Sequence, residues 1–164
     1  MLVFGLSFLR FAPEGNTVSV PAGAKAGDLI LRACSFATEG GSYAADCGAL
    51  VVPENRADEQ SRLIAVPVTR IPARSDHARA PIFILQGGPG RTNMTFDKVS
   101  RYADERDVIL VGYRGVDGSV RLDCPEVESA LSHSTDLVSE QTSRAYADAF
   151  RSYANRLTGE GVDL

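Results

Sequence analysis

The chain has 164 residues, of which 44% are hydrophobic and 23% charged, and this composition is typical of one soluble globular domain. Its formal net charge of −4 argues against a nucleic-acid binder, which must neutralise several phosphates. With two lysines, the sequence has no basic cluster suited to a membrane surface. We therefore expect no nucleic-acid partner.

The first nine residues, Met1 to Leu9, are apolar but far shorter than the roughly 20 residues that cross a bilayer. They fit two interpretations equally well: the remnant of an export signal or membrane anchor, or a loosely packed N-terminal strand. Residues 12–28 are rich in proline, glycine and alanine and predict an extended lead-in. The chain thus divides into an apolar start and lead-in over residues 1–28 and a globular part over residues 29–164.

Three short strands are predicted next, over residues 29–36, 49–53 and 62–70, because these runs are apolar or β-branched and a polar turn separates the last two. Pro67 has no N–H group to donate to a neighbouring strand, so we expect an edge strand or a bulge at this position. The three segments predict an antiparallel ribbon.

Three cysteines bear on this ribbon. Cys34 and Cys47 flank a polar, glycine-rich stretch, which favours a loop closed by a disulfide and thereby an oxidising compartment. With this bridge Cys124 is expected to be unpaired, and two buried thiols at positions 34 and 47 are the alternative. The two histidines, His77 and His133, lack the spacing of metal ligands, so we expect no metal and no cofactor.

Residues 81–85 and 107–111 are continuous apolar runs, typical of strands that are covered on both faces in an α/β sheet. Residues 92–105, between them, predict a helix. Asp123 as N-cap and Pro125 in the first turn mark another helix start. A longer helix, with a Glu140–Arg144 pair, ends near Gly159. Its apolar residues recur at helical spacing and predict a core face: Tyr146, Phe150, Tyr153 and Leu157.

These elements together predict an α/β fold with antiparallel lead-in strands, then a strand, a glycine-rich loop, a helix, a strand and helices. The sheet is expected to be incomplete, because no further buried strand follows the last helix.

The glycine-rich loop, Gln86-Gly-Gly-Pro-Gly90, directly follows a predicted strand. Glycines there allow backbone conformations that turn N–H groups toward an anionic oxygen, either of a phosphate or of the oxyanion in acyl transfer. The phosphate-loop and dinucleotide-binding patterns both fail at this position. The oxyanion interpretation is favoured, because α/β-hydrolases place such a turn between their third strand and first helix.

This loop resembles the His-Gly-Gly-Pro-Gly loop of proline iminopeptidases and tripeptidyl aminopeptidases, which are α/β-hydrolases. Residues 112–119, Gly-Tyr-Arg-Gly-Val-Asp-Gly-Ser, resemble their Asp-x-Arg-Gly-x-Gly-x-Ser motif, and residues 47–53, Cys-Gly-Ala-Leu-Val-Val-Pro, are similar to the tripeptidyl aminopeptidase lead-in. The resemblance covers roughly residues 34–164. It implies a serine peptidase that releases N-terminal residues from peptides, with a peptide or small acyl compound as substrate.

The resemblance also implies roles for individual residues. The Gly88 N–H is the expected oxyanion donor, and Gly87 shapes the turn. Apart from the resemblance, we expect the guanidinium of Arg114 to satisfy loop carbonyls rather than to bind substrate. We expect Asp117 and Ser119 to cap or stabilise the turn that contains them. The residues expected to support the loop are Gln86, Pro89, Gly90, Arg114, Gly115, Asp117 and Ser119. A tight strand-to-helix connection without a ligand is the alternative interpretation.

Three positions depart from the family pattern: Gln86 replaces the usual His, Gly112 replaces the first Asp, and Asp117 replaces a Gly. Substrate contacts near the loop are therefore expected to differ from those of better-known members.

The family's reaction needs a Ser on a Gly-x-Ser-x-Gly turn, then an acid and a His, and this sequence contains no such set. We expect the N-terminal part of a hydrolase domain, ending before the nucleophile strand and inactive alone. The alternative is a non-catalytic half-fold that serves as a binding or regulatory module.

In the family's sheet, the strand corresponding to residues 81–85 lies beside the nucleophile strand. We therefore expect the isolated chain to expose an open apolar edge at residues 82–85 and to self-associate or be poorly soluble. The expected disulfide, the apolar start and the secreted habit of the resembled aminopeptidases predict an extracytoplasmic location.

Overall fold

The computed structural model describes residues 16–88, 90–134 and 136–163. The two interpretations of the apolar start and the supporting role expected of Pro89 lie outside the described residues.

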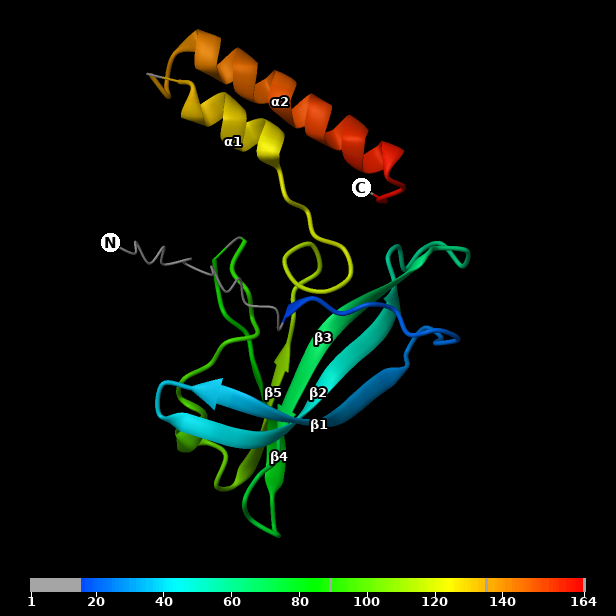
Figure 1. Ribbon diagram of the computed structural model, residues 1–164, viewed down its shortest axis with the longest axis vertical. Coiled ribbons are helices and arrows are strands. Elements are labelled where there is room, and N and C mark those ends of the chain that lie inside the picture. The colour runs from blue at the N-terminus through cyan, green and yellow to red at the C-terminus, as the bar shows by residue number, and fades with distance from the viewer. Residues whose placement is uncertain (1–15, 89, 135, 164) are drawn as a thin grey trace, which may run out of the picture.

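The architecture is α/β, with one open five-stranded sheet and a pair of helices (Figure 1). The strands lie in the order β1-β2-β3-β5-β4, and every neighbouring pair is antiparallel except β4 and β5, which are parallel. Their bounds are Leu29–Thr38 for β1, Gly41–Pro53 for β2, Leu63–Ile71 for β3, Arg79–Ile84 for β4 and Arg106–Val111 for β5.

The predicted antiparallel ribbon is confirmed, and its first two strands are longer than the sequence indicated. They form one hairpin in which Thr38 opposes Gly41 across the turn. Cys34 of β1 and Cys47 of β2 form a disulfide with their Cα atoms 5.8 Å apart, which confirms the predicted pairing. The free cysteine among the described residues is Cys124.

The edge position or bulge expected at Pro67 is wrong. Strand β3 lies between β2 and β5, and its register with β2 runs unbroken through Pro67, which opposes Ala49. The ladder with β5 ends at Val68 opposite Val111, and the Pro67 carbonyl accepts the Gly112 N–H at 2.9 Å. In an antiparallel strand the N and O atoms of a residue point to the same neighbouring strand, so the nitrogen of Pro67 faces the β5 side. The ladder to β5 has already ended there, and the missing N–H group therefore breaks no ladder hydrogen bond.

The expectation that the two apolar runs are covered on both faces is wrong for the first of them. Strand β4 is the edge of the sheet, and Phe83 is 59% exposed on it. Strand β5 is an inner strand, and its Val108 and Leu110 are fully buried. The same kind of apolar run therefore marks both an inner and an edge strand in this sheet.

The helix predicted over residues 92–105 is also wrong, because the structure has only the short 3-10 helix η2, Val99–Arg101. The start of the segment is held by side chains instead of helical carbonyls: the Asn93 N–H donates to Asp117, and the Met94 N–H donates to Thr92 Oγ1 at 3.0 Å.

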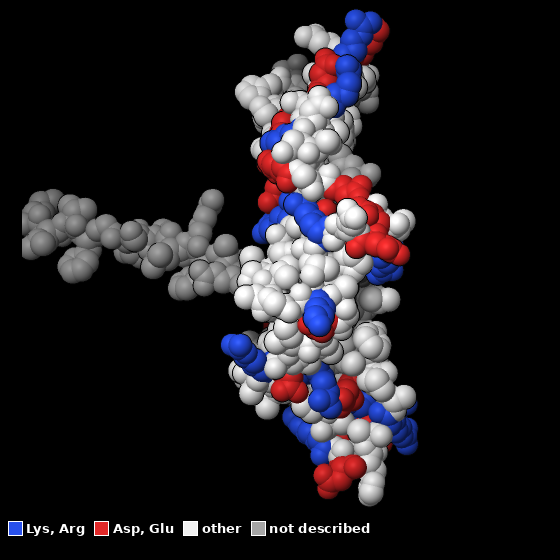
Figure 2. Space-filling view, turned by 90° about the vertical axis from the view of Figure 1, so that its right-hand side faces the viewer, with Lys and Arg blue, Asp and Glu red and all other residues white. Residues whose placement is uncertain are grey.

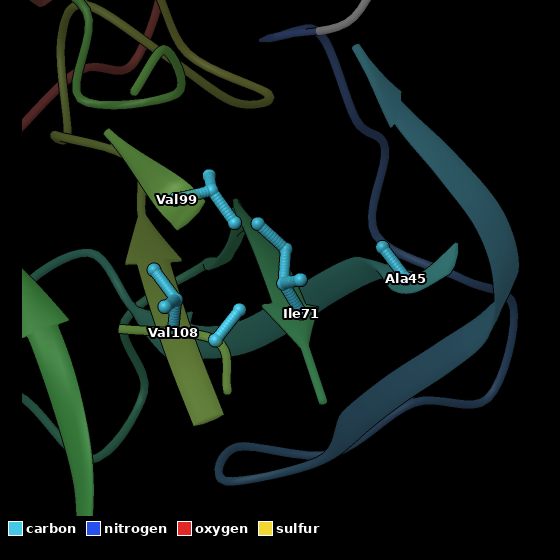
Figure 3. Close-up of a cluster of buried hydrophobic side chains, with 5 residues drawn as sticks. Ala45, Ile71, Val99 and Val108 are labelled. Carbon is cyan, nitrogen blue, oxygen red and sulfur yellow. The ribbon is translucent and has the colours of Figure 1, made fainter. Parts of the chain in front are cut away.

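The rest of this segment covers one face of the sheet and completes the core there. Val99 and Ala103 pack against buried residues of the strands (Figure 3). This cluster, the hydrophobic core on that face, consists of Ala45, Ile71, Val99, Ala103 and Val108.

Helices α1 (Pro125–Ser132) and α2 (Glu140–Gly159) form a hairpin beyond one end of the sheet (Figure 1). The N-cap of α1 is Cys124 rather than the predicted Asp123, with Pro125 at the first helical position as expected. The predicted end of α2 at Gly159 and the Glu140–Arg144 ion pair are confirmed.

The aromatic stripe of α2 is a core face only at its C-terminal end. Leu157 is fully buried, whereas Tyr146 and Phe150 are 39% and 43% exposed. The helices pack on each other, with Arg156 of α2 bonded to Glu126 of α1 at 2.6 Å, and not as a layer over the sheet. None of the helices in the described part of the chain has the length and apolar character that a bilayer crossing requires.

Candidate functional site

Two loops meet at the end of the parallel strand pair. The glycine-rich loop leaves β4 after Ile84, and the turn over residues 112–119, here called the β5 turn, leaves β5 after Val111. Because parallel strands end at the same edge of a sheet, both loops emerge side by side. The Tyr113 hydroxyl of the β5 turn donates to the Gln86 carbonyl at 2.7 Å and joins them. The structure thus brings together the two segments that the sequence singled out.

The described glycines of the loop are exposed, and two of them have conformations that favour glycine. Gly88 has φ +103° and Gly90 has φ +75°, whereas no positive φ occurs at Gly87. Within the described residues, the N–H groups of Gly87 and Gly88 donate no hydrogen bond. Because Gly87 and Gly88 are exposed residues, these unbonded donors are available to an anionic oxygen.

Asn93 anchors the start of the glycine-rich loop from inside the protein. It is fully buried, and its Oδ1 accepts the Gln86 N–H at 2.9 Å. Its Nδ2 donates to the carbonyls of Ile84 and Val111, both at 2.7 Å. One side chain therefore fixes the ends of β4 and β5 relative to the first residue of the loop.

Asp117 is the second buried anchor, 2% exposed, and it lies in the β5 turn. Its Oδ1 accepts the Thr92 hydroxyl at 2.8 Å, and its Oδ2 accepts the N–H groups of Tyr113 at 3.0 Å and Asn93 at 3.4 Å. Asn16 Nδ2 donates to the same Thr92 hydroxyl at 2.7 Å. The carboxylate therefore binds the β5 turn to the segment that follows the glycine-rich loop.

Gln86, which stands where the resembled family has His, holds the loop through its side chain and through its backbone. Its side-chain Nε2 donates to the Thr95 carbonyl, and its backbone contacts Asn93 and Tyr113 as described above. The amide is thus engaged within the protein and supports the loop.

Three more of the predicted residues shape the β5 turn or fix it to β3 and to the residue after β2. Ser119 Oγ accepts the Ala65 N–H at 2.8 Å, and the Arg114 guanidinium donates to the Glu54 carbonyl. Gly115 has φ +82°, and a Cβ there would lie 2.8 Å from Leu122. These contacts are structural.

A cavity of about 170 Å³ lies beside the β5 turn, and its lining includes Glu54, Arg114, Gly115, Leu122 and Asp163. Arg62 binds both carboxylate oxygens of Glu54, at 2.6 and 2.9 Å. This hydrogen bonding lowers the pKa of Glu54, against an opposing effect of burial. A carboxylate so paired is a poor proton acceptor, so Glu54 is unsuited to act as a general base.

Among the described residues, no hydrogen bond links His77 or His133 to the glycine-rich loop or the β5 turn. His133 lies at the end of α1, where its Nδ1 is 2.7 Å from the Ser129 carbonyl. No group of His, Cys, Asp and Glu in the described ranges is arranged to hold a metal ion. On the face drawn in Figure 2, basic and acidic side chains are interspersed and form no large area of one sign.

Sequence reasoning missed Thr92 and Asn93, which carry the anchoring. One signal was present: two polar side chains follow the glycine-rich loop where the first turn of a helix was expected, and such side chains compete with helical hydrogen bonding.

Comparison with known proteins found no match to this chain among family models, curated sequences or solved structures. The observations define the class as an α/β protein with a mostly antiparallel, open sheet and a pair of anchored loops at its parallel end.

Proposed function

We propose that this chain forms the oxyanion-loop part of a serine hydrolase of the α/β fold. The observation that carries the proposal is the glycine-rich loop. Its exposed residue Gly88 has an N–H group that donates no hydrogen bond among the described residues, and its first residue, Gln86, is fixed by the buried Asn93. Donors that are held in place before charge develops are what an oxyanion hole requires.

The position of β4 supports the same proposal. In the resembled family, the strand before the glycine-rich loop lies beside the strand that carries the nucleophilic serine. Here β4 has β5 on one side, and no strand of the described residues pairs with its other side. A nucleophile strand added there brings its serine to the end of the sheet where Gly88 lies, and the residue after the serine supplies the second donor.

The substrate class rests on the resemblance of the two loops. We infer an aminopeptidase that releases N-terminal residues from peptides, with an acyl-enzyme formed on a serine outside this sequence. The Cys34–Cys47 disulfide supports an extracytoplasmic location, because such bonds persist in oxidising compartments.

The protein isolated from its natural source tests the proposal directly. We expect an intact mass well above that of the 164-residue chain, labelling of one serine by a fluorophosphonate probe, and hydrolysis of aminoacyl or tripeptidyl anilides. The 164-residue chain alone should remain unlabelled. A folded natural protein that neither reacts with the probe nor hydrolyses the anilides contradicts the proposal and favours a binding or regulatory module.

The role of Gly88 is tested by Gly88→Ala in the probe-reactive protein. The φ of +103° disfavours alanine by about 1–2 kcal/mol, so the loop should relax and turn the N–H group away. We expect kcat to fall by about 10²-fold, as when an oxyanion donor is lost. Gly23→Ala is the matched control: φ is +76° there, nothing lies within 4 Å of its Cβ, and kcat should be unchanged. Equal effects of the two variants would remove the special role of Gly88.

A further inference from the structure

The β5 turn contains a carboxylate that is buried among neutral donors. Asp117 accepts hydrogen bonds from the Thr92 hydroxyl and from the N–H groups of Asn93 and Tyr113. Burying a charged group is unfavourable unless hydrogen bonds replace its lost hydration, and these bonds meet that requirement. Two of the three donors belong to the segment after the glycine-rich loop, so the carboxylate acts between loops and not only within its own turn.

Gly112, the first residue of the β5 turn, is what allows Asp117 to occupy this place. A Cβ added at Gly112 would lie 2.7 Å from the Asp117 Cβ and 2.6 Å from the Pro67 Cγ. The Cβ atoms at positions 112 and 117 would therefore be closer than two non-bonded carbons can approach, and both cannot be present without a shift of the backbone.

These two positions are also the ones at which the β5 turn departs from the motif it resembles, which has Asp at the position of Gly112 and Gly at the position of Asp117. Each departure taken alone is a loss, of a carboxylate at one position and of a small residue at the other. Taken together they exchange the two side chains. We propose that the exchange is coupled, so that Asp117 supplies from the sixth position of the turn the carboxylate that the motif places at the first.

The same contacts make Asp117 a positioning residue for the glycine-rich loop. Its carboxylate holds the Asn93 backbone, and the Asn93 side chain holds the Gln86 N–H at 2.9 Å, one residue before Gly87. It also holds the Tyr113 backbone, and the Tyr113 hydroxyl holds the Gln86 carbonyl. The Asp117 carboxylate therefore positions both the N–H and the carbonyl of Gln86 indirectly, through Asn93 and Tyr113. The positioning rests on contacts alone, and only its use in catalysis rests on the proposed function.

The test uses the 164-residue chain and compares Asp117→Gly, Gly112→Asp and the double exchange G112D/D117G. Each single variant should lower the melting temperature by about 5 °C or more, since one leaves buried donors unpaired and the other places two carboxylates in one space. In the double variant we expect recovery of at least half of the loss caused by Asp117→Gly. Asp76→Gly, at an exposed acid, is the control for the added backbone freedom and should change little.

A second readout separates positioning from stability. In amide NMR spectra, Asp117→Gly should shift or broaden the resonances of Gly87 and Gly88, which it does not contact, and the double exchange should return them toward the wild-type positions. Asp76→Gly should leave them in place. Unmoved resonances in Asp117→Gly would overturn the positioning role.

The Pro67 ring also limits the space at position 112, so all variants are repeated with Pro67→Ala. Recovery in either background supports the coupled exchange. Additive losses in both backgrounds, or a double variant that folds in neither, would overturn it. Because none of these measurements uses enzymatic activity, they can fail while the hydrolase proposal stands, and can succeed if the natural protein shows no reactive serine.

Discussion

Asn93 forms hydrogen bonds with three backbone groups at the end of the parallel strands: the Gln86 N–H and the carbonyls of Ile84 and Val111. Asn93→Ala leaves these groups unpaired in a buried place, so we expect a loss of about 3 kcal/mol in unfolding free energy. Asn93→Asp keeps the shape but sets a carboxylate against two carbonyls, and its loss should be at least as large.

Urea unfolding measures the free energy of unfolding of both variants, with Asn155→Ala on the exposed surface of α2 as control. A loss below about 1 kcal/mol for Asn93→Ala would show that water or backbone rearrangement replaces the amide.

Glu54 makes a second residue-scale prediction, about pH. Its side chain is 8% exposed, and the hydrogen bonds from Arg62 lower its pKa below the ordinary value of 4.5. A carboxylate whose pKa is lower in the folded than in the unfolded protein stabilises the fold at pH values above 4.5, and this stabilisation is lost as the pH falls through the folded value.

Glu54→Gln should therefore cost about 1–2 kcal/mol at pH 7 and have less effect as the solution is acidified below pH 4.5. Unfolding free energies measured from pH 7 to pH 3 check this, with the exposed Glu128→Gln as control. A difference between wild type and Glu54→Gln that is constant with pH would contradict it.

At the scale of elements, the sequence was informative where structure is decided locally. The first three strands, the end of α2 at Gly159 and the Glu140–Arg144 pair follow from spacing and turn residues, and all are confirmed. The helix expected over residues 92–105 failed because Asn93 serves groups of β4 and β5, which are adjacent only in the folded sheet. Pro67 was misplaced for a similar reason: the position at which β5 stops pairing is not encoded near the proline.

The β1–β2 hairpin makes the prediction for an element. The Cys34–Cys47 bridge closes a sequence separation of 13 residues, and removing it should restore chain entropy worth about 3 kcal/mol to the unfolded state. We expect C34S/C47S to unfold at lower urea concentration than wild type, and reduced wild type to match the double variant. Cys124→Ser should leave the midpoint unchanged. Two freely alkylated thiols at 34 and 47 in the oxidised protein would contradict the bridge.

At the scale of the whole molecule, the site combines loops that were recognisable in the sequence with anchors that were not. The glycines of residues 86–90 and the Arg114-Gly115 pair form short motifs, so residue type and order suffice to find them. The anchoring by Asn93 and Asp117 depends on the parallel pairing of β4 and β5, which brings residues about 25 positions apart within hydrogen-bond distance. Such a contact has no local signature.

The free side of β4 makes the last prediction, on self-association. The strand is an edge, and Phe83 and the following Leu85 are 59% and 74% exposed, so nothing in the described residues covers this row of apolar side chains and unpaired backbone groups. Natural edge strands are commonly protected by lysine, and Phe83→Lys introduces that protection.

In sedimentation velocity, the wild-type chain should show a mass that rises with concentration, and Phe83→Lys should shift it toward the monomer. Val138→Lys is the control, because Val138 is 91% exposed but lies in the helical hairpin, away from any strand edge. A wild-type chain that stays monomeric, or an equal shift in the control, would exclude the β4 edge as the contact. The same edge cannot hold a second copy and a nucleophile strand together, so a natural protein with the proposed nucleophile strand in place should keep a constant mass as its concentration rises.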